Sequence, residues 1–201
     1  MSDKYTLTIQ NDSTQTGDFC IFQEAPDINI PNIVTLAWLS KTAHPTTRLI
    51  FDWTVSYNFV WATNTDLAPG TQVNTSQSWD ANLQTLNRVD FDYLDGAYTF
   101  SNPRQGDYAG NLYIDQQQRV QSNGASVGIG MSGKGAFMVP SQPNMNIVMT
   151  PKPTYWVVFG SFSEGEVLDI GKVSESAYKV VFRGTNNMQL TYTANNTWQL
   201  G

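Results

Sequence analysis

The sequence predicts an all-β protein: one antiparallel β-sandwich domain, jelly-roll-like, over residues 1–201. Three observations predict it. Apolar and polar residues alternate over long stretches, Asn, Asp and Gly separate these stretches, and charged residues make up only 14% of the chain. A period of two buries one face of a strand, and uncharged polar residues suit sheet surfaces better than helix faces. We expect about eleven to thirteen short strands and at most one or two short helices.

The longest alternating run covers residues 49–61, where every odd position is apolar, and it predicts one long strand. Shorter alternating runs predict strands at 5–9, 89–93, 178–182 and 188–192. The apolar runs FCIF (19–22) and YWVVF (155–159) predict strands that are covered on both faces.

Hairpin turns are expected at 94–96 (LDG), 186–187 (NN) and 195–196 (NN), because Asn, Asp and Gly tolerate positive φ. The one notable helix candidate is 32–40 (NIVTLAWLS), and a short turn is expected at 80–86. No stretch indicates a linker, a repeat or a second domain.

The segment GIGMSGKG (128–135) matches both G-x-G-x-x-G and G-x-x-x-x-G-K, two phosphate-binding patterns. The residues before it are polar, prolines at 140, 143, 151 and 153 exclude a following helix, and Gly135 replaces the required Ser or Thr. The sequence instead predicts a hairpin of 125–131 and 137–139 around a turn at 132–135. Gly128 and Gly130 then mark a bulge or a close approach of another backbone or a ligand.

The composition limits the classes of partner and the cellular locations that we expect. A formal charge of −6 and a pI near 4.5 argue against nucleic-acid binding. Cys20 is the single cysteine, which excludes an intrachain disulfide. No apolar window is long enough for a transmembrane helix, and the N-terminus does not look like a signal peptide. We expect a soluble, cytoplasmic protein, with release by a non-classical route left open.

Catalytic and metal-binding patterns are weak. His44, the single histidine, precedes Pro45 and is interpreted as a loop residue. One His and one Cys are too few for a structural zinc site. Asp90 and Asp92 fail the spacing of a calcium loop, so a solvated strand face is expected. We expect no catalytic residue, no metal and no cofactor.

The densest group of carboxylates is Glu164, Glu166 and Asp169. Paired carboxylates can hydrolyse glycosides, but the sequence does not fix their separation. An enzyme that uses these groups or His44 is therefore the third of three hypotheses.

Aromatic residues make up 12% of the chain, with six tryptophans. Most are expected in the core, but Trp61, Trp79 and Trp198 are candidates for outward-facing rings. An exposed ring beside Asn, Asp and Gly forms a sugar-binding platform, since the ring covers C–H faces while amides bind hydroxyls. The predicted ligand-binding residues lie in 61–66 and 102–111: Trp61, Asn64, Asp66, Arg104, Asp107, Tyr108 and Asn111.

Four segments, GDFCIFQ (17–23), LAWLSKTAHP (36–45), SVGIGMSGKG (126–135) and YWVVFGSFSEGEVLDI (155–170), resemble the RhiA family of small bacterial proteins named for rhizosphere expression. The resemblance spans most of the chain and is carried by apolar strand segments. It implies an abundant, cell-density-regulated soluble protein of host-associated bacteria with no established reaction. It provides no functional residues to carry over.

Two classes of function remain ahead of an enzyme. The preferred one is a non-enzymatic protein that binds a ligand, most plausibly a glycan or a host surface. The alternative is a self-assembling or membrane-active protein, in the manner of β-rich toxins, that uses residues 124–139 as an adaptable element. A homo-oligomer is compatible with both.

Overall fold

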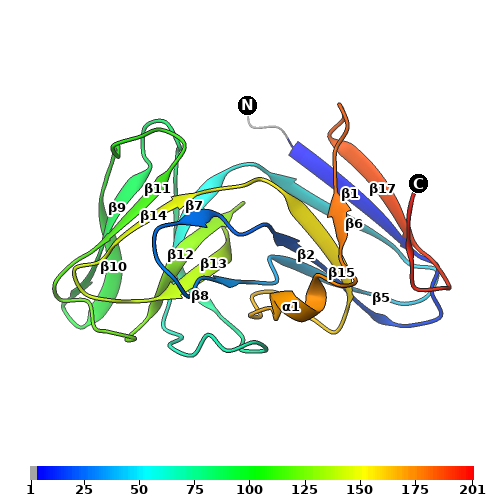
Figure 1. Ribbon diagram of the computed structural model, residues 1–201, viewed down its shortest axis with the longest axis horizontal. Coiled ribbons are helices and arrows are strands. Elements are labelled where there is room, and N and C mark those ends of the chain that lie inside the picture. Colours follow the sequence, from blue (N-terminus) through cyan, green and yellow to red (C-terminus); the bar gives the residue numbers. More distant parts are fainter. Residues whose placement is uncertain (1–3) are drawn as a thin grey trace.

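The computed structural model describes residues 4–201, which form four β-sheets arranged as two facing pairs (Figure 1). Strands account for 53% of the chain and helix for 2%. The prediction of an all-β, sandwich-like fold is confirmed, with four sheets in place of the two of a simple sandwich.

Sheet A contains, in spatial order, β18 (Trp198–Leu200), β17 (Asn187–Tyr192), β1 (Lys4–Asn11) and β6 (Arg48–Thr54). Sheet B contains β16 (Tyr178–Val180), β15 (Tyr155–Gly160), β2 (Gly17–Gln23) and β5 (Leu39–Ala43). Sheet C contains β10 (Ala97–Arg104), β9 (Arg88–Leu94), β11 (Leu112–Gln116), β14 (Asn146–Thr150) and β3 (Asp27–Ile28). Sheet D contains β4 (Val34–Thr35), β13 (Lys134–Pro140), β12 (Ser126–Met131), β7 (Tyr57–Ala62) and β8 (Thr75–Asp80).

The described part of the chain thus has 18 strands, more than the expected eleven to thirteen. Four of them, β3, β4, β16 and β18, have only two or three residues, too few to leave a periodic signal. Most neighbouring strands are antiparallel, but β1 and β17 pair in parallel, as do β9 and β11.

Aromatic contacts show which sheets face each other. Sheet A packs on sheet B, where the rings of Trp53 and Tyr155 lie 4.9 Å apart. Sheet C packs on sheet D, where the rings of Phe59 and Phe100 lie 6.1 Å apart. One cluster of buried side chains contains residues from all four sheets, so the two pairs share a hydrophobic core.

The outer faces of sheets B and D are also covered. The short helix α1 (Ile170–Val173) and its flanks pack on the outer side of sheet B, and the segments 63–74 and 163–168 pack on that of sheet D. Strands β2 and β12 are therefore buried almost throughout, as predicted for 19–22. The outer faces of sheets A and C carry polar side chains, for example Asp52 on β6 and Asp90 on β9.

The chain passes between the two pairs of sheets four times, at 23–27, 35–39, 54–57 and 150–155. The expected single strand at 49–61 is wrong for this reason. Strand β6 ends in sheet A at Thr54, and β7 begins in sheet D at Tyr57. The alternation continues through the break because it reports which side of the chain is buried, not which sheet buries it.

The expected helix at 32–40 is also wrong: this segment forms β4, the start of β5 and an extended link between them. An extended chain advances about 3.3 Å per residue, against about 1.5 Å in a helix. The link has to reach from sheet D to sheet B, which favours the extended form.

The turn predictions are mostly confirmed. Asp95 and Gly96 form the β9–β10 hairpin with positive φ, Asn196 does the same between β17 and β18, and 83–85 form a turn. The hairpin expected at 186–187 is wrong, because β16 lies in sheet B and β17 in the facing sheet A.

The hairpin predicted in place of a phosphate loop is confirmed. Strands β12 and β13 pair around Ser132 and Gly133, both with positive φ, and a bulge follows Ile129. A Cβ atom at Gly128 or Gly130 would collide with the backbone carbonyl of Phe137 or Lys134. Both glycines therefore make room for the backbone of β13, not for a ligand.

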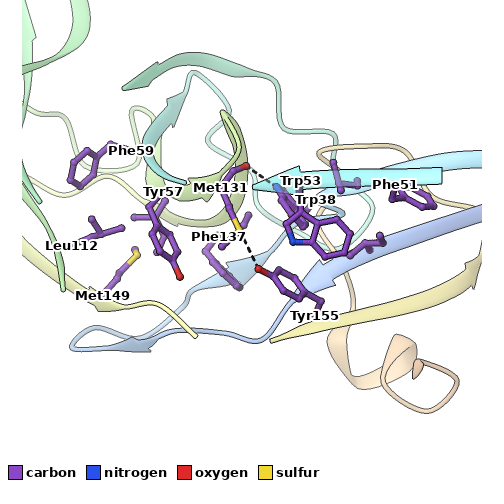
Figure 2. Close-up of a cluster of buried hydrophobic side chains, with 14 of the residues drawn as sticks. Trp38, Phe51, Trp53, Tyr57, Phe59, Leu112, Met131, Phe137, Met149 and Tyr155 are labelled. Atoms are coloured by element: carbon purple, nitrogen blue, oxygen red, sulfur yellow. Dashed lines mark hydrogen bonds between the residues drawn. The ribbon is translucent and has the colours of Figure 1, made fainter. Parts of the chain in front are cut away.

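This hairpin turn holds the two pairs of sheets together (Figure 2). The indole nitrogen of buried Trp38 donates a hydrogen bond of 2.9 Å to the carbonyl oxygen of Met131. The Tyr155 hydroxyl donates to the Met131 sulfur over 3.4 Å. Burial raises the pKa of Tyr155 to about 12, so the phenol stays protonated and can donate. Ser132 Oγ accepts from Thr54 N at 3.0 Å and donates to Thr54 O at 2.8 Å.

We predict that Trp38→Phe lowers the free energy of unfolding by about 2–4 kcal/mol, because it removes the buried hydrogen bond from the indole to the Met131 carbonyl and opens a small cavity. Urea denaturation followed by circular dichroism measures the change. The control is Trp156→Phe, a half-buried ring on sheet B, which should cost less than about 1 kcal/mol. Equal losses for both variants would contradict the role of the junction.

Candidate functional site

Charged side chains cover the outer face of sheet C. Along β9, Val89 and Phe91 point into the core, so Arg88, Asp90 and Asp92 point outward. In the neighbouring strand β11, register places Tyr113 beside Arg88, and the guanidinium carbon lies 4.5 Å from the centre of the Tyr113 ring. The alternation of one strand therefore creates a row of charges on an ordered surface.

The charges on this face are paired with one another. Arg88 binds both carboxylate oxygens of Asp107, at 3.0 and 3.2 Å, and its Nε lies 3.2 Å from Asp115. Arg104 lies 2.8 Å from Asp90 and 2.6 Å from Asp115. Burial raises the pKa of Asp115, and the two arginines oppose that effect. The result is a fixed network of two cations and three carboxylates.

Asn87 positions the loop beside this network. It is fully buried, and its amide nitrogen donates 2.9 Å hydrogen bonds to the carbonyl oxygens of Tyr108 and Asn111. Its amide oxygen accepts from Gly106 N at 2.7 Å. Gly106 lies against the Tyr113 ring so closely that a Cβ atom would collide with it. One buried amide thus fixes both ends of 106–111.

Tyr108 is the exposed ring of this loop. Its side chain is 72% exposed, whereas its backbone nitrogen donates to the Tyr113 hydroxyl at 3.1 Å. Asn111 also donates to that hydroxyl, at 3.2 Å, and Leu86, another exposed apolar residue, directly precedes Asn87. An aromatic face on a rigid loop, with a carboxylate and an amide beside it, is suited to a ligand with both apolar and hydroxyl surfaces.

The structure brings together four of the seven predicted site residues: Arg104, Asp107, Tyr108 and Asn111. Sequence reasoning missed Asn87, Arg88, Tyr113 and Asp115. Extending the alternation of 89–93 back by one residue would have placed Arg88 on the same face as Asp90, but no pattern indicated that β11 lies beside β9.

The other three predicted residues lie elsewhere. Trp61 is half-buried between sheets C and D, where it packs near Phe91 and donates to Gln77 at 2.8 Å. Asn64 and Asp66 bind backbone groups within the segment 63–74. Trp79 and Trp198 are also half-buried and pack against the core. None of these tryptophans forms an open platform.

The remaining candidate catalytic groups, His44 and Cys20, have different surroundings. His44 is exposed, with its Nδ1 3.0 Å from the Thr16 hydroxyl, whereas Cys20 is buried in an apolar cluster that raises the pKa of its thiol. Among residues 4–201 there is no group of three or more His, Cys, Asp or Glu side chains suited to a metal ion.

The three clustered carboxylates have different local partners. Glu164 pairs with Lys134 at 2.6 Å, Glu166 accepts from Ser163 N at 2.9 Å, and Asp169 caps α1. Each carboxylate therefore serves a local contact.

In the described residues, no helix is long and apolar enough to cross a bilayer.

The geometry defines an all-β protein with a rigid, solvent-facing platform on one sheet. The comparisons with known proteins give its family: the model of the RhiA family matches residues 2–201. The chain is 30% identical to Protein RhiA of Rhizobium leguminosarum bv. viciae over 200 residues, 98% of this chain and 86% of that protein. No solved structure matches. The chain therefore belongs to the RhiA family, and the resemblance in its strand segments is confirmed.

We predict that Asn87→Ala lowers the free energy of unfolding by about 2–3 kcal/mol, because three partly buried backbone groups lose their hydrogen bonds to one buried amide. The amide of Gly106 should also exchange with deuterium faster. The control is Asn29→Ala: Asn29 makes two similar backbone hydrogen bonds but is exposed, so water replaces the amide at a cost below about 1 kcal/mol. A Gly106 exchange rate unchanged in Asn87→Ala would contradict the positioning role.

The pH dependence of stability should report the Asp92–Arg119 pair. The hydrogen bond from Arg119 lowers the pKa of nearly buried Asp92, against the effect of burial. A lowered folded-state pKa stabilises the protein above the ordinary value of about 4, and this contribution is lost as the pH falls through the folded-state pKa. The difference in unfolding free energy between wild type and Asp92→Asn should thus be largest near neutral pH and shrink below about pH 4.

Urea titrations at a series of pH values measure this difference. Arg119→Gln removes the partner and keeps the carboxyl group, so it should lose part of the same pH dependence. A gap between wild type and Asp92→Asn that stays constant with pH would contradict the role of the pair.

Proposed function

We propose that this RhiA-family protein is a non-enzymatic glycan-binding protein whose site is the Tyr108 platform, formed by Tyr108, Asp107, Asn111 and the Arg88 side chain. The single observation that carries the proposal is the exposure of the Tyr108 ring on a loop fixed by a buried amide. Among residues 4–201, Tyr108 is the one exposed aromatic residue, and the other aromatic residues are buried or half-buried.

The platform fits the chemistry of a sugar. The face of the Tyr108 ring can cover the C–H groups of a pyranose, while the Asp107 carboxylate and the Asn111 amide offer an acceptor and a donor to its hydroxyls. Because Asn87 already orders the loop, binding would lose little conformational entropy. Preorganisation of this kind favours binding at this loop.

The electrostatics favour a neutral glycan. Arg88 and Arg104 are each bound to carboxylates, and the network contains one more carboxylate than cations. The whole chain has a formal charge of −6. An acidic polysaccharide would meet net repulsion here, whereas neutral hydroxyl groups can exchange hydrogen bonds with the fixed network.

For the self-assembling or membrane-active alternative, the described residues offer no observation comparable to the exposed Tyr108 ring. Strands β12 and β13, which it would use, lie inside sheet D with a neighbouring strand on each side and are buried on both faces. Their release would expose a large apolar surface and break two ladders of hydrogen bonds.

We predict that a glycan array detects binding to neutral glycans, and that Tyr108→Ala weakens the binding at least about tenfold by removing the stacking surface. Tyr108→Phe keeps the ring and should retain most of the affinity. The matched control is Ile50→Ala, which removes an exposed apolar side chain from β6 in sheet A. Titration calorimetry with the best glycan measures each variant. No binding on the array, or equal binding by Tyr108→Ala, would overturn the proposal.

A further inference from the structure

An edge of sheet B continues into a segment with free backbone groups. Strand β16 is the outermost strand of sheet B, and residues 181–183, which belong to no strand, follow it. Within residues 4–201, no backbone hydrogen bond involves Val181, Phe182 or Arg183. A free strand edge is a template for pairing with another chain.

This edge borders two hollows, of about 420 and 520 Å³, that share Lys179, Val181 and Phe182. Phe182 anchors the segment, because its ring packs 4.8 Å from that of Tyr5 and 5.7 Å from that of Trp53. Val181 points outward and is 47% exposed, and Leu200, 62% exposed, lines the first hollow. We call this region the β16 groove.

The β16 groove is positively charged in an acidic protein. Lys179 and Arg183 line it, and no Asp or Glu lines either hollow. Among the described residues, neither cation pairs with a carboxylate, although the Lys179 ammonium lies 5.5 Å from the centre of the Trp156 ring. The groove therefore complements an acidic partner.

We propose that the β16 groove binds an extended acidic segment of another protein, which adds as a strand beside β16. The free backbone of 181–183 would pair with the partner's backbone, and side chains at alternate positions would give specificity. Lys179, Val181 and Arg183 fall at alternate positions with one outward face, and the two cations are about 13 Å apart along a strand.

The face of the groove predicts a pattern for the partner. Opposite side chains in a strand pair attract when their charges differ, so acids should face Lys179 and Arg183, with an apolar residue between them facing Val181. The expected partner carries Glu-x-Val-x-Glu or an equivalent.

A second copy of the same strand does not fit. Antiparallel pairing of two β16 strands centred on Val181 would place Lys179 opposite Arg183 of the other copy, which is repulsive. An acyl chain with a carboxylate could use the apolar wall and the cations, but it would leave the backbone groups unpaired. The free backbone thus favours a peptide.

The test uses a fluorescein-labelled, capped peptide of sequence Thr-Glu-Thr-Val-Thr-Glu-Thr and measures its anisotropy with the full chain at low ionic strength. The wild-type protein should bind it at least about tenfold more tightly than the analogue with Lys in place of Glu. An analogue with N-methyl groups at alternate residues should bind at least about tenfold more weakly, because it cannot form the ladder.

Charge reversal in the protein separates specific binding from misfolding. Lys179→Glu with Arg183→Glu should invert the preference, so that the Lys peptide binds and the Glu peptide does not, a gain that an unfolded protein cannot show. The control, Arg48→Glu with Lys172→Glu, makes the same change in net charge away from the groove and should keep the wild-type preference.

Three results would overturn the proposal. The first is equal binding of the N-methylated and unmodified peptides. The second is displacement of the peptide by dodecanoate, combined with insensitivity to N-methylation, which would indicate an amphiphile site. The third is a stable dimer in analytical ultracentrifugation that the charge reversal dissociates, which would show that a second copy covers the groove.

Discussion

The fold depends on the contacts of one hairpin turn with three of the four chain crossings. The Met131 carbonyl binds the Trp38 indole in the crossing at 35–39, and the Met131 sulfur binds Tyr155 at the end of the crossing at 150–155 (Figure 2). Ser132 binds Thr54 and Ser56, which both lie in the crossing at 54–57. Each pair of sheets could slide relative to the other if only apolar contacts joined them, because such contacts lack direction. Directional hydrogen bonds at the turn fix one arrangement.

The glycine-rich segment therefore has a structural purpose that its motif does not reveal. Gly128 and Gly130 allow β13 to lie unusually close to β12 around the bulge, and this brings the turn at Ser132 to the junction. A phosphate loop and this hairpin both use glycine for close approach, the former to a ligand and the latter to a backbone. The surrounding strands, not the glycine spacing, distinguish the two.

The sequence predicted the parts of the fold that local physics determines. Alternation identified strands and their buried faces, and the positive-φ residues Asp95 and Asn196 marked two hairpins. The sequence could not predict which sheet a strand joins, because strand pairing depends on contacts between residues that are far apart in the sequence. The break at 55–56 and the parallel β1–β17 pair are of this kind. The segment 32–40 was misjudged because tertiary contacts overrode its local preference.

The same distinction explains the candidate site. The loop residues Asp107, Tyr108 and Asn111 were predictable as a group because they are neighbours in sequence, whereas Asn87 and Arg88 reach them only through the β9–β11 pairing. The two proposed surfaces differ in charge. On sheet C, two arginines are bound to three carboxylates, while the edge of sheet B presents two cations that have no carboxylate partner within residues 4–201. A polar ligand without charge suits the first surface, and a charged extended chain suits the second, so the two functions would not compete for one ligand.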